Sequence, residues 1–311
     1  MSLYDNGDRN DGFISFQNLG SRHLAKFGPC RYLSLGPRIH DYWNASVNTA
    51  DRLLAVLRLF TLERPEWTAD EAAKEIGVSI STAYRYFRSL CRIGLLDPFN
   101  GNYILGPAIV EYDRQIRIID PMIKVGRPAM QRLIARSDSM GTALLCRVYR
   151  NCVMCVHQEA RIPFENTIGY ERGRPMPMFR GASSKIIFAN LPSRSARWFF
   201  SRFPEEIAAA GLGSDWEAVK ANLRRIRKAG IHVARGEVDS DHVGIAAPIF
   251  DPKKKVVGSI TMVLLQSEAT PGLVANVSAL VQAAGREIDA GLLLLSHGGV
   301  SRDPLLQPLR R

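Results

Sequence analysis

The chain has 311 residues, of which 46% are hydrophobic and 23% charged, a composition typical of globular proteins with room for two domains. No apolar run approaches the roughly 20 residues that cross a bilayer, and no export signal is evident, so we expect a cytoplasmic protein without a membrane partner. Five scattered cysteines are too few for a disulfide framework in a chain of this size, which fits a reducing compartment.

The net charge of +11 is unevenly distributed along the chain. Residues 48–105 contain seven Lys/Arg and seven Asp/Glu, whereas residues 121–311 contain 27 basic and 16 acidic residues. Bulk charge therefore does not locate a nucleic-acid surface. A local stretch does, because residues 79–93 contain three arginines and no acidic residue.

Turn-forming pairs interrupt residues 1–46, which we expect to be a poorly ordered extension. A minor-groove arm is an alternative role for this extension. The pattern then changes, and apolar residues at Leu53, Val56, Leu57 and Phe60 have the spacing of an amphipathic helix. We predict a first helix here.

Two further helices are predicted from their start and stop signals. Thr68 and Glu71 form a capping-box pattern, and Gly77 can end the short helix that follows. Ser79 can cap the next helix, which places Ala83, Tyr86, Phe87 and Leu90 on its inner side. Leu95-Leu96 and residues 103–105 then flank a turn at residues 97–101, which predicts a short hairpin. Helices followed by a hairpin predict a winged helix-turn-helix domain over residues 47–105.

The outer face of the helix after Ser79 is the predicted DNA-reading surface, because one α-helix fits the major groove. Arg85, one turn into the helix, can contact guanine, whereas Arg88 and Arg92 lie further along and suit phosphates. The candidate DNA-binding residues on this helix are Ser79, Ser81, Thr82, Tyr84, Arg85, Arg88 and Arg92. Asn100 and Asn102 at the hairpin tip complete the set. The alternative is a small helical bundle whose arginines only face solvent.

The rest of the chain mixes helices and strands. A connecting helix over residues 106–120 ends at Asp120-Pro121, and another helix reaches about Ser137. Strands are expected at 142–149, 152–158, 245–250 and 256–265, with helices near 182–190 and 215–229. A long helix begins at Thr270-Pro271 with an inward stripe of Val274, Val277, Val281, Ile288 and Leu292. Residues 297–311 are expected to be a disordered tail.

Taken together, these stretches resemble the IclR family of bacterial regulators. The resemblance rests on residues 68–85 and 90–96 in the first domain and on 181–192, 228–230, Glu237 and 244–251 in the second. It covers roughly residues 48–296. It implies a GAF/PAS-like antiparallel sheet with flanking helices, an effector pocket on one face of that sheet, and a homodimer or homotetramer. Ser184, Ile186 and Gly244 depart from the usual family residues, so the identity of the effector does not carry over.

The expected fold is therefore of the α/β class (α+β type). An all-α winged helix-turn-helix domain (47–105) and a linker helix (106–120) precede a GAF-like effector-binding domain (121–296).

The effector site is expected where a loop becomes a helix at residues 181–185. Amide groups at a helix start favour an anion such as a carboxylate, and the preceding Pro175–Phe179 stretch can supply an apolar wall. The candidate effector-binding residues around this helix start are Ile168, Met176, Phe179, Ala182 and Ser183. The family resemblance adds His242, Gly244 and Thr261, which it places on facing strands. We expect a hydrophobic organic acid, such as an aromatic acid. The alternative is that Ser183 is only an N-cap and the methionines are ordinary core.

Other motifs are weaker. Cys152-x-x-Cys155 with His157 resembles half of a zinc site, but a second Cys/His pair is missing, so core thiols are the better interpretation. No nucleotide-binding, nucleophile-elbow or metalloprotease motif is present in the sequence. We therefore predict a protein that is not an enzyme and uses no cofactor or metal.

The predicted function is a regulator that binds a palindromic double-stranded DNA operator and responds to a small-molecule effector. Two alternatives remain open. One is an enzyme that uses Cys155/His157 or Ser183/Lys185 beside an accessory helix-turn-helix; the other is a winged helix that contacts only proteins.

Overall fold

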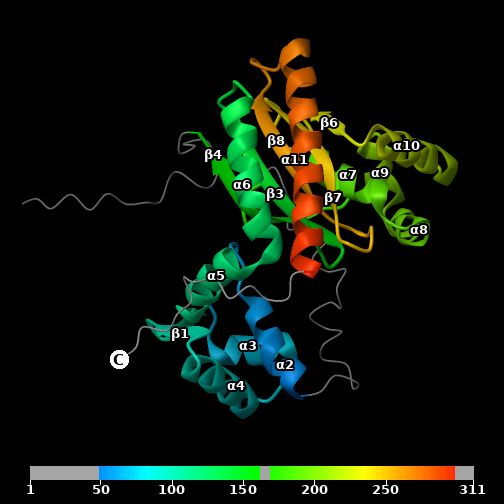
Figure 1. The fold of residues 1–311 in the computed structure, drawn as a ribbon. Coiled ribbons are helices and arrows are strands. Elements are labelled where there is room, and N and C mark those ends of the chain that lie inside the picture. The colour runs from blue at the N-terminus through cyan, green and yellow to red at the C-terminus, as the bar shows by residue number, and fades with distance from the viewer. Residues whose placement is uncertain (1–48, 162–168, 298–311) are drawn as a thin grey trace, which may run out of the picture.

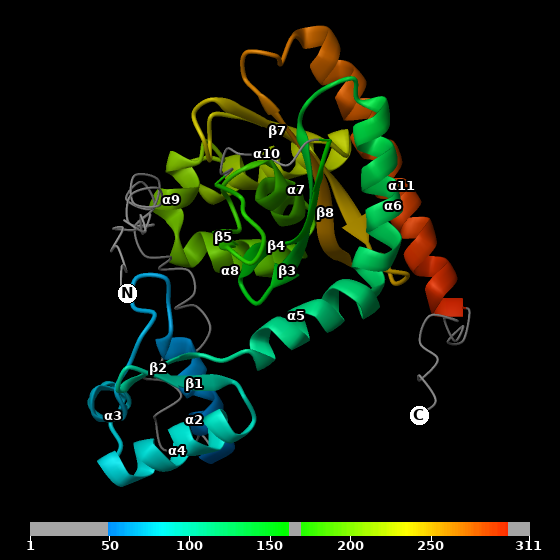
Figure 2. The ribbon, with the colours of Figure 1, turned by 90° about the vertical axis from the view of Figure 1, so that its left-hand side faces the viewer.

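The computed structural model describes residues 49–161 and 169–297, and Figures 1 and 2 show two domains joined by a helix. The expectations for residues 1–46 and for the C-terminal tail after His297 lie outside the described residues. The N-terminal domain consists of α2 (Thr49–Ala55), the 3-10 helix η3 (Val56–Leu59), α3 (Ala69–Ile76), α4 (Ile80–Arg92), β1 (Leu96–Phe99) and β2 (Asn102–Leu105).

The first predicted helix changes character partway along. It is α-helical only to Ala55 and continues as a 3-10 turn that ends at Phe60, whose backbone is extended. A 3-10 turn aligns residues that are three apart, which is how Val56 and Leu59 are both buried. The prediction of one regular amphipathic helix was therefore wrong in its second half.

The start and stop signals of α3 and α4 are confirmed. Thr68 and Glu71 form the reciprocal capping box, and Gly77 adopts the left-handed conformation with φ of 67°. Ser79 caps α4 by accepting a hydrogen bond from the Thr82 amide. The predicted inner residues Ala83, Tyr86, Phe87 and Leu90 are all buried.

The wing is a tighter hairpin than expected. Phe99 pairs with Asn102, so the turn is only Asn100-Gly101, and both residues have positive φ (50° and 81°) as a two-residue type I′ turn requires. Residues 97–99, predicted as turn, belong to β1. Trp67 also pairs with Tyr103, which fastens the wing to the helical core.

Helix α5 (Ala108–Ile119) connects the domains, and α6 (Pro121–Arg136) follows after a corner at Asp120. Asp120 accepts hydrogen bonds from the amides of Met122 and Ile123, so the residue that ends one helix caps the next. Pro128 lies inside α6 without ending it.

The C-terminal domain is built on one six-stranded antiparallel sheet with the strand order β5-β4-β3-β8-β7-β6. Its strands are β3 (Thr142–Tyr149), β4 (Cys152–Ala160), β5 (Pro175–Pro177), β6 (His232–Arg235), β7 (His242–Phe250) and β8 (Val256–Leu265). Its remaining helices are α7 (Ala182–Asn190), α8 (Ser193–Arg202), α9 (Pro204–Ala209), α10 (Trp216–Ala229) and α11 (Pro271–His297).

Helices cover both faces of this sheet. One face packs against α6 and α11, and the other packs against α7, behind which α8, α9 and α10 lie (Figures 1 and 2). The predicted stripe of α11 is confirmed, because Val277, Val281 and Ile288 are buried and its end members pack against the same core. The sequence analysis missed α8, α9, β5 and β6; neither α8 nor α9 has a side-chain cap that would mark its start.

Candidate functional site

The outer face of α4 carries the predicted DNA-reading residues. Ala83, Phe87 and Leu90 are committed to the core, which leaves the opposite face at the outer edge of the domain (Figure 2). Ser79, Ser81, Tyr84, Arg85, Arg88 and Arg92 are exposed, and Thr82 is half-buried. Within the described residues, none of the three arginines on this face makes an ion pair. Their guanidinium groups are therefore available to an external anion.

The hydroxyl groups at the start of α4 are partly engaged in the helix itself. Ser79 Oγ accepts from the Thr82 amide at 3.3 Å and lies 2.8 Å from Thr82 Oγ1 and 3.1 Å from Ser81 Oγ. Ser79 and Thr82 therefore stabilise the helix start. Tyr84, which is 46% exposed, and Arg85 extend from the next turn.

The wing presents its two asparagines differently. Asn100 is exposed at the turn, whereas the Asn102 side-chain amide donates to Glu66 Oε2 at 2.8 Å. Asn102 therefore has a structural partner inside the domain. Phe99, which is 50% exposed, is a large apolar side chain at the wing tip that the sequence analysis did not single out.

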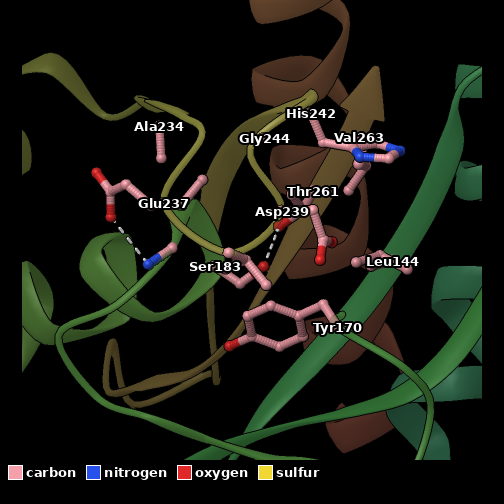
Figure 3. Close-up of a pocket in the computed structure, with 13 residues that line it drawn as sticks. Leu144, Tyr170, Ser183, Ala234, Glu237, Asp239, His242, Gly244, Thr261 and Val263 are labelled. Carbon is pink, nitrogen blue, oxygen red and sulfur yellow. Dashed lines mark hydrogen bonds between the residues drawn. The ribbon is translucent and has the colours of Figure 1, made fainter. Parts of the chain in front are cut away.

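A small cavity of about 40 Å³ lies between the sheet and the start of α7 (Figure 3). The predicted residues Ala182, Ser183, His242, Gly244 and Thr261 all line it. The residues that sequence reasoning missed are Leu144, Tyr170, Ala234, Val238, Asp239 and Val263; Gly181 and Glu237, which also line it, lay in stretches that carry the family resemblance.

Two predicted effector residues, Met176 and Phe179, do not line this cavity. Met176 and Phe179 are buried in the hydrophobic core, and Phe179 packs against Phe203 with ring centroids 5.8 Å apart. Ile168 lies outside the described residues. The apolar stretch before α7 therefore belongs to the hydrophobic core that adjoins the cavity.

Helix α7 begins at Gly181, whose φ of 81° and ψ of 161° suit glycine. A Cβ atom there would also lie 2.9 Å from Val238. Because Gly181 is the N-cap and no side chain caps the helix, the alternative that Ser183 is only an N-cap was wrong. Ser183 Oγ instead lies 2.8 Å from Thr261 Oγ1, joining α7 to β8 across the cavity (Figure 3).

The start of α7 already holds an anion, the carboxylate of Glu237. Its Oε2 accepts from the Gly181 amide at 3.0 Å, and its Oε1 lies 2.7 Å from Lys185 Nζ. Lys185 also donates to the Ala210 carbonyl at 2.6 Å and is buried. Glu237 therefore compensates part of the positive potential at the start of α7, where we expected an effector carboxylate to bind.

Two loop segments cover the cavity and are bonded to each other. The Gly169 amide donates to Asp239 Oδ2 at 2.7 Å, and Tyr170 Oη lies 2.7 Å from Ser184 Oγ. Burial raises the pKa of the Tyr170 hydroxyl well above its usual value, so this group stays protonated and neutral. Asp239 and Glu237 add acidic oxygens at this wall (Figure 3).

The cysteines behind the cavity are core thiols. Cys146 of β3 and Cys155 of β4 are opposite each other in the sheet register and are fully buried. Burial raises the pKa of the Cys146 thiol well above its ordinary value. A raised pKa disfavours the thiolate that reacts or binds metal. Over the described residues, no group of three or more His, Cys, Asp or Glu is arranged to hold a metal ion.

No helix in the described part of the chain is both long and apolar enough to cross a membrane.

A winged helix with a free basic face, joined to a second domain built on an antiparallel sheet, is the architecture of two-domain DNA-binding regulators. The sequence model for the IclR helix-turn-helix domain matches residues 49–98, and that for the bacterial transcriptional regulator IclR C-terminal domain matches residues 120–290. The chain belongs to the IclR family of bacterial transcriptional regulators.

Relatives of known name or structure agree with this assignment. The chain is 23% identical over 251 residues to the HTH-type transcriptional regulator XynR of Escherichia coli K12, covering 79% of this chain and 97% of XynR. A regulator of the family from Alicyclobacillus acidocaldarius has the same fold, with a TM-score of 0.64, 19% identity and coverage of 77% and 96% of the two chains. An IclR homolog from Microbacterium hydrocarbonoxydans, solved in complex with 4-hydroxybenzoate, gives a TM-score of 0.60, 20% identity and coverage of 78% and 97%.

Proposed function

We propose that this regulator binds a palindromic operator as a dimer through α4 and that a small organic effector bound beside α7 changes its operator affinity. The observation that carries the proposal is the division of α4 into a buried face and an exposed face with unpaired arginines. Arginine in the major groove can bind guanine with two hydrogen bonds, and neighbouring arginines can bind phosphates. We assign the first role to Arg85 and the second to Arg88 and Arg92.

The proposed dimer contact is a stripe along α5. This helix buries none of its residues, and Ile109, Tyr112, Ile116 and Ile119 follow one another at spacings of three and four, which places them on one face. They are between 37% and 60% exposed. A second copy of α5 offers the same stripe, and a self-complementary contact is what a two-fold dimer needs. A two-fold dimer in turn matches a palindromic operator.

The proposed effector is a small organic molecule that carries both an acidic group and a hydroxyl group. Because Glu237 already accepts from the Gly181 amide, we place the acid group at the remaining backbone amides of the first turn of α7, and the acidic oxygens of Asp239 favour a hydrogen-bond donor. The related Microbacterium regulator bound to 4-hydroxybenzoate supports this class of ligand. The cavity of about 40 Å³ is far smaller than the roughly 300 Å³ or more of small-molecule sites, so its cover must move to admit the effector.

The test starts from DNA. Purified full-length chain should select duplexes from a randomised library, and the enriched sequences should form an inverted repeat. Enrichment of no sequence, or of a single unpaired half-site, would contradict the proposal. A thermal-shift screen with 4-hydroxybenzoate and other hydroxylated carboxylic acids then tests the effector site without reference to DNA.

A further inference from the structure

One segment of the effector domain touches both the cavity and the linker helix. We call residues 169–172 the cover segment. Gly169 and Tyr170 form the cavity side, through their hydrogen bonds to Asp239 and Ser184. Two residues beyond Tyr170, the guanidinium of Arg172 pairs with Asp113 of α5. A single short segment therefore connects the effector cavity to the helix that carries the DNA-binding domain.

Arg172 is attached to the edge of the sheet, and only one residue separates it from Tyr170, so a displacement of Tyr170 is expected to strain this attachment. Arg172 forms a β-bridge with Cys155, and the Gly173 amide donates to the Cys155 carbonyl at 2.9 Å. Arg172 Nε donates to the Val156 carbonyl at 2.7 Å. These contacts hold the side chain extended toward Asp113.

Helix α5 depends on few contacts for its orientation. Over the described residues it buries no side chain fully, and Ala108 at its N-terminal end is its only residue packed against a hydrophobic core, that of the N-terminal domain. At its C-terminal end, Asp120 forms the corner with α6 and pairs with Arg147 of β3 at 2.5 Å. Two turns earlier, Asp113 pairs with Arg172, roughly 10 Å along the helix axis from the corner. The two ion pairs fix the direction of α5 relative to the sheet.

The Asp113–Arg172 pair is suited to repeated breaking and forming. Its side chains are 35% and 23% exposed, so water can solvate both charges when they separate. Arg117 contacts the same carboxylate at 2.8 Å from within α5, and Arg172 keeps the Val156 carbonyl. Neither charge would be left buried without a partner.

We propose that Arg172 and Asp113 are the positioning residues through which the effector cavity controls the linker helix. The inference deepens the proposed function and rests on it for the role of the cavity. A molecule that enters the cavity displaces Tyr170 and the cover segment with it. Arg172 then leaves Asp113, and α5 becomes free to rotate about Asp120. The angle of the DNA-binding domain changes as a result.

The test uses amide hydrogen exchange on the full-length chain without DNA, so a failure to bind DNA would not affect it. Arg172→Gln should raise exchange in α5 by about two- to fivefold, the change expected when a partly exposed ion pair is lost. The matched control is Arg117→Gln, which removes the other partner of Asp113 without touching the effector domain. Equal effects of the two variants would overturn the proposal.

A cavity-filling variant tests the coupling itself. Val263 lines the cavity, and Val263→Phe should displace the cover segment as an effector would. It should raise exchange in α5 in the native background and add nothing in the Arg172→Gln background. An equal increase in both backgrounds would overturn the proposal, because the signal would then bypass Arg172. Val263→Leu, a smaller change, serves the same cycle if the phenylalanine variant does not fold.

Discussion

Lys185 Nζ lies 2.7 Å from Glu237 Oε1, and this ion pair joins the first turn of α7 to the loop that follows β6. The side chain of Lys185 is only 6% exposed, whereas that of Glu237 is 27% exposed. The loop also carries Asp239, so the pair holds one side of the cavity cover in place. Its two members should respond unequally to mutation.

Replacing Glu237 by Ala should destabilise the protein more than replacing Lys185 by Met. The first change leaves a buried ammonium without its counter-ion, a loss of about 3–5 kcal/mol in comparable pairs. The second leaves a carboxylate that is partly solvated and still accepts from Gly181. Unfolding in urea gives the free energy of unfolding of both variants. Glu217→Ala, which breaks the exposed Lys220–Glu217 pair, is the control and should have almost no effect. A larger loss of stability in Lys185→Met than in Glu237→Ala would contradict this account.

Stability should fall as the pH drops from 6.5 toward 4 because of His232. Burial, reinforced by the positive charge of Lys185, lowers the pKa of His232 from 6.5 to about 4. In this window the unfolded chain binds a proton at His232 and the folded chain does not, so acid favours unfolding. The effect is of the order of 3 kcal/mol across the window.

His232→Asn should flatten the unfolding free energy over that pH range, whereas His297→Asn, at the exposed end of α11, should leave it unchanged. Chemical denaturation at half-unit pH steps would show the difference. Parallel curves for native protein and His232→Asn would rule out the assignment.

Arg85→Ala should weaken operator binding by about 1–3 kcal/mol and relax the sequence preference at one position of each half-site. Arg88→Ala should instead weaken binding to all sequences and reduce the salt slope by about one. Fluorescence anisotropy at several salt concentrations separates the two. Arg224→Ala, an exposed arginine on α10, is the control. An unchanged affinity in Arg85→Ala would leave the winged helix without its proposed role.

Ile116→Glu should convert the proposed dimer to a monomer, because it places a charge in the middle of the apolar stripe of α5. Ile118→Glu is a matched control, since Ile118 is 48% exposed, Ile116 is 47% exposed, and the two face opposite sides of the same helix. Light scattering coupled to size exclusion gives the molecular mass directly. Dissociation by both variants, or by neither, would argue against the stripe as the interface.

Gly244→Val should abolish the response to an effector while retaining operator binding. A Cβ atom at Gly244 would lie 3.1 Å from the Ala182 Cβ, so a valine would occupy the space between β7 and α7. The measurement is the thermal shift produced by whichever hydroxylated carboxylic acid stabilises the native chain. Gly272→Val, where nothing lies within 4 Å, is the control. A preserved thermal shift in Gly244→Val would place the effector elsewhere.

The DNA-binding domain could be predicted closely because its signals are local. The capping box at Thr68 and Glu71, the left-handed Gly77 and the Ser79 cap each depend on residues within one helical turn. The boundary of the wing was wrong because distant partners help to decide it. Trp67 pairs with Tyr103, and the Asn102 side chain donates to Glu66, 36 residues away.

The cavity was predicted only in part for the same reason. The helix start located Ser183 and the resemblance located His242, Gly244 and Thr261, but Tyr170 and Asp239 come from loops with no periodic pattern. Glu237 is one of the residues that carry the resemblance, which gives it no structural role, and only the structure shows it at the start of α7.

What the sequence by itself determined was the helix-turn-helix core and the polarity of α4, since both follow from hydrophobic spacing and from hydrogen bonds between near neighbours. The tertiary structure alone decided which loops cover the cavity and which charged residues form ion pairs. Those pairs are Arg172 with Asp113 and Lys185 with Glu237. Those pairings join residues 52 to 59 positions apart, and such distances are set by the packing of the sheet and its helices, which no local pattern records.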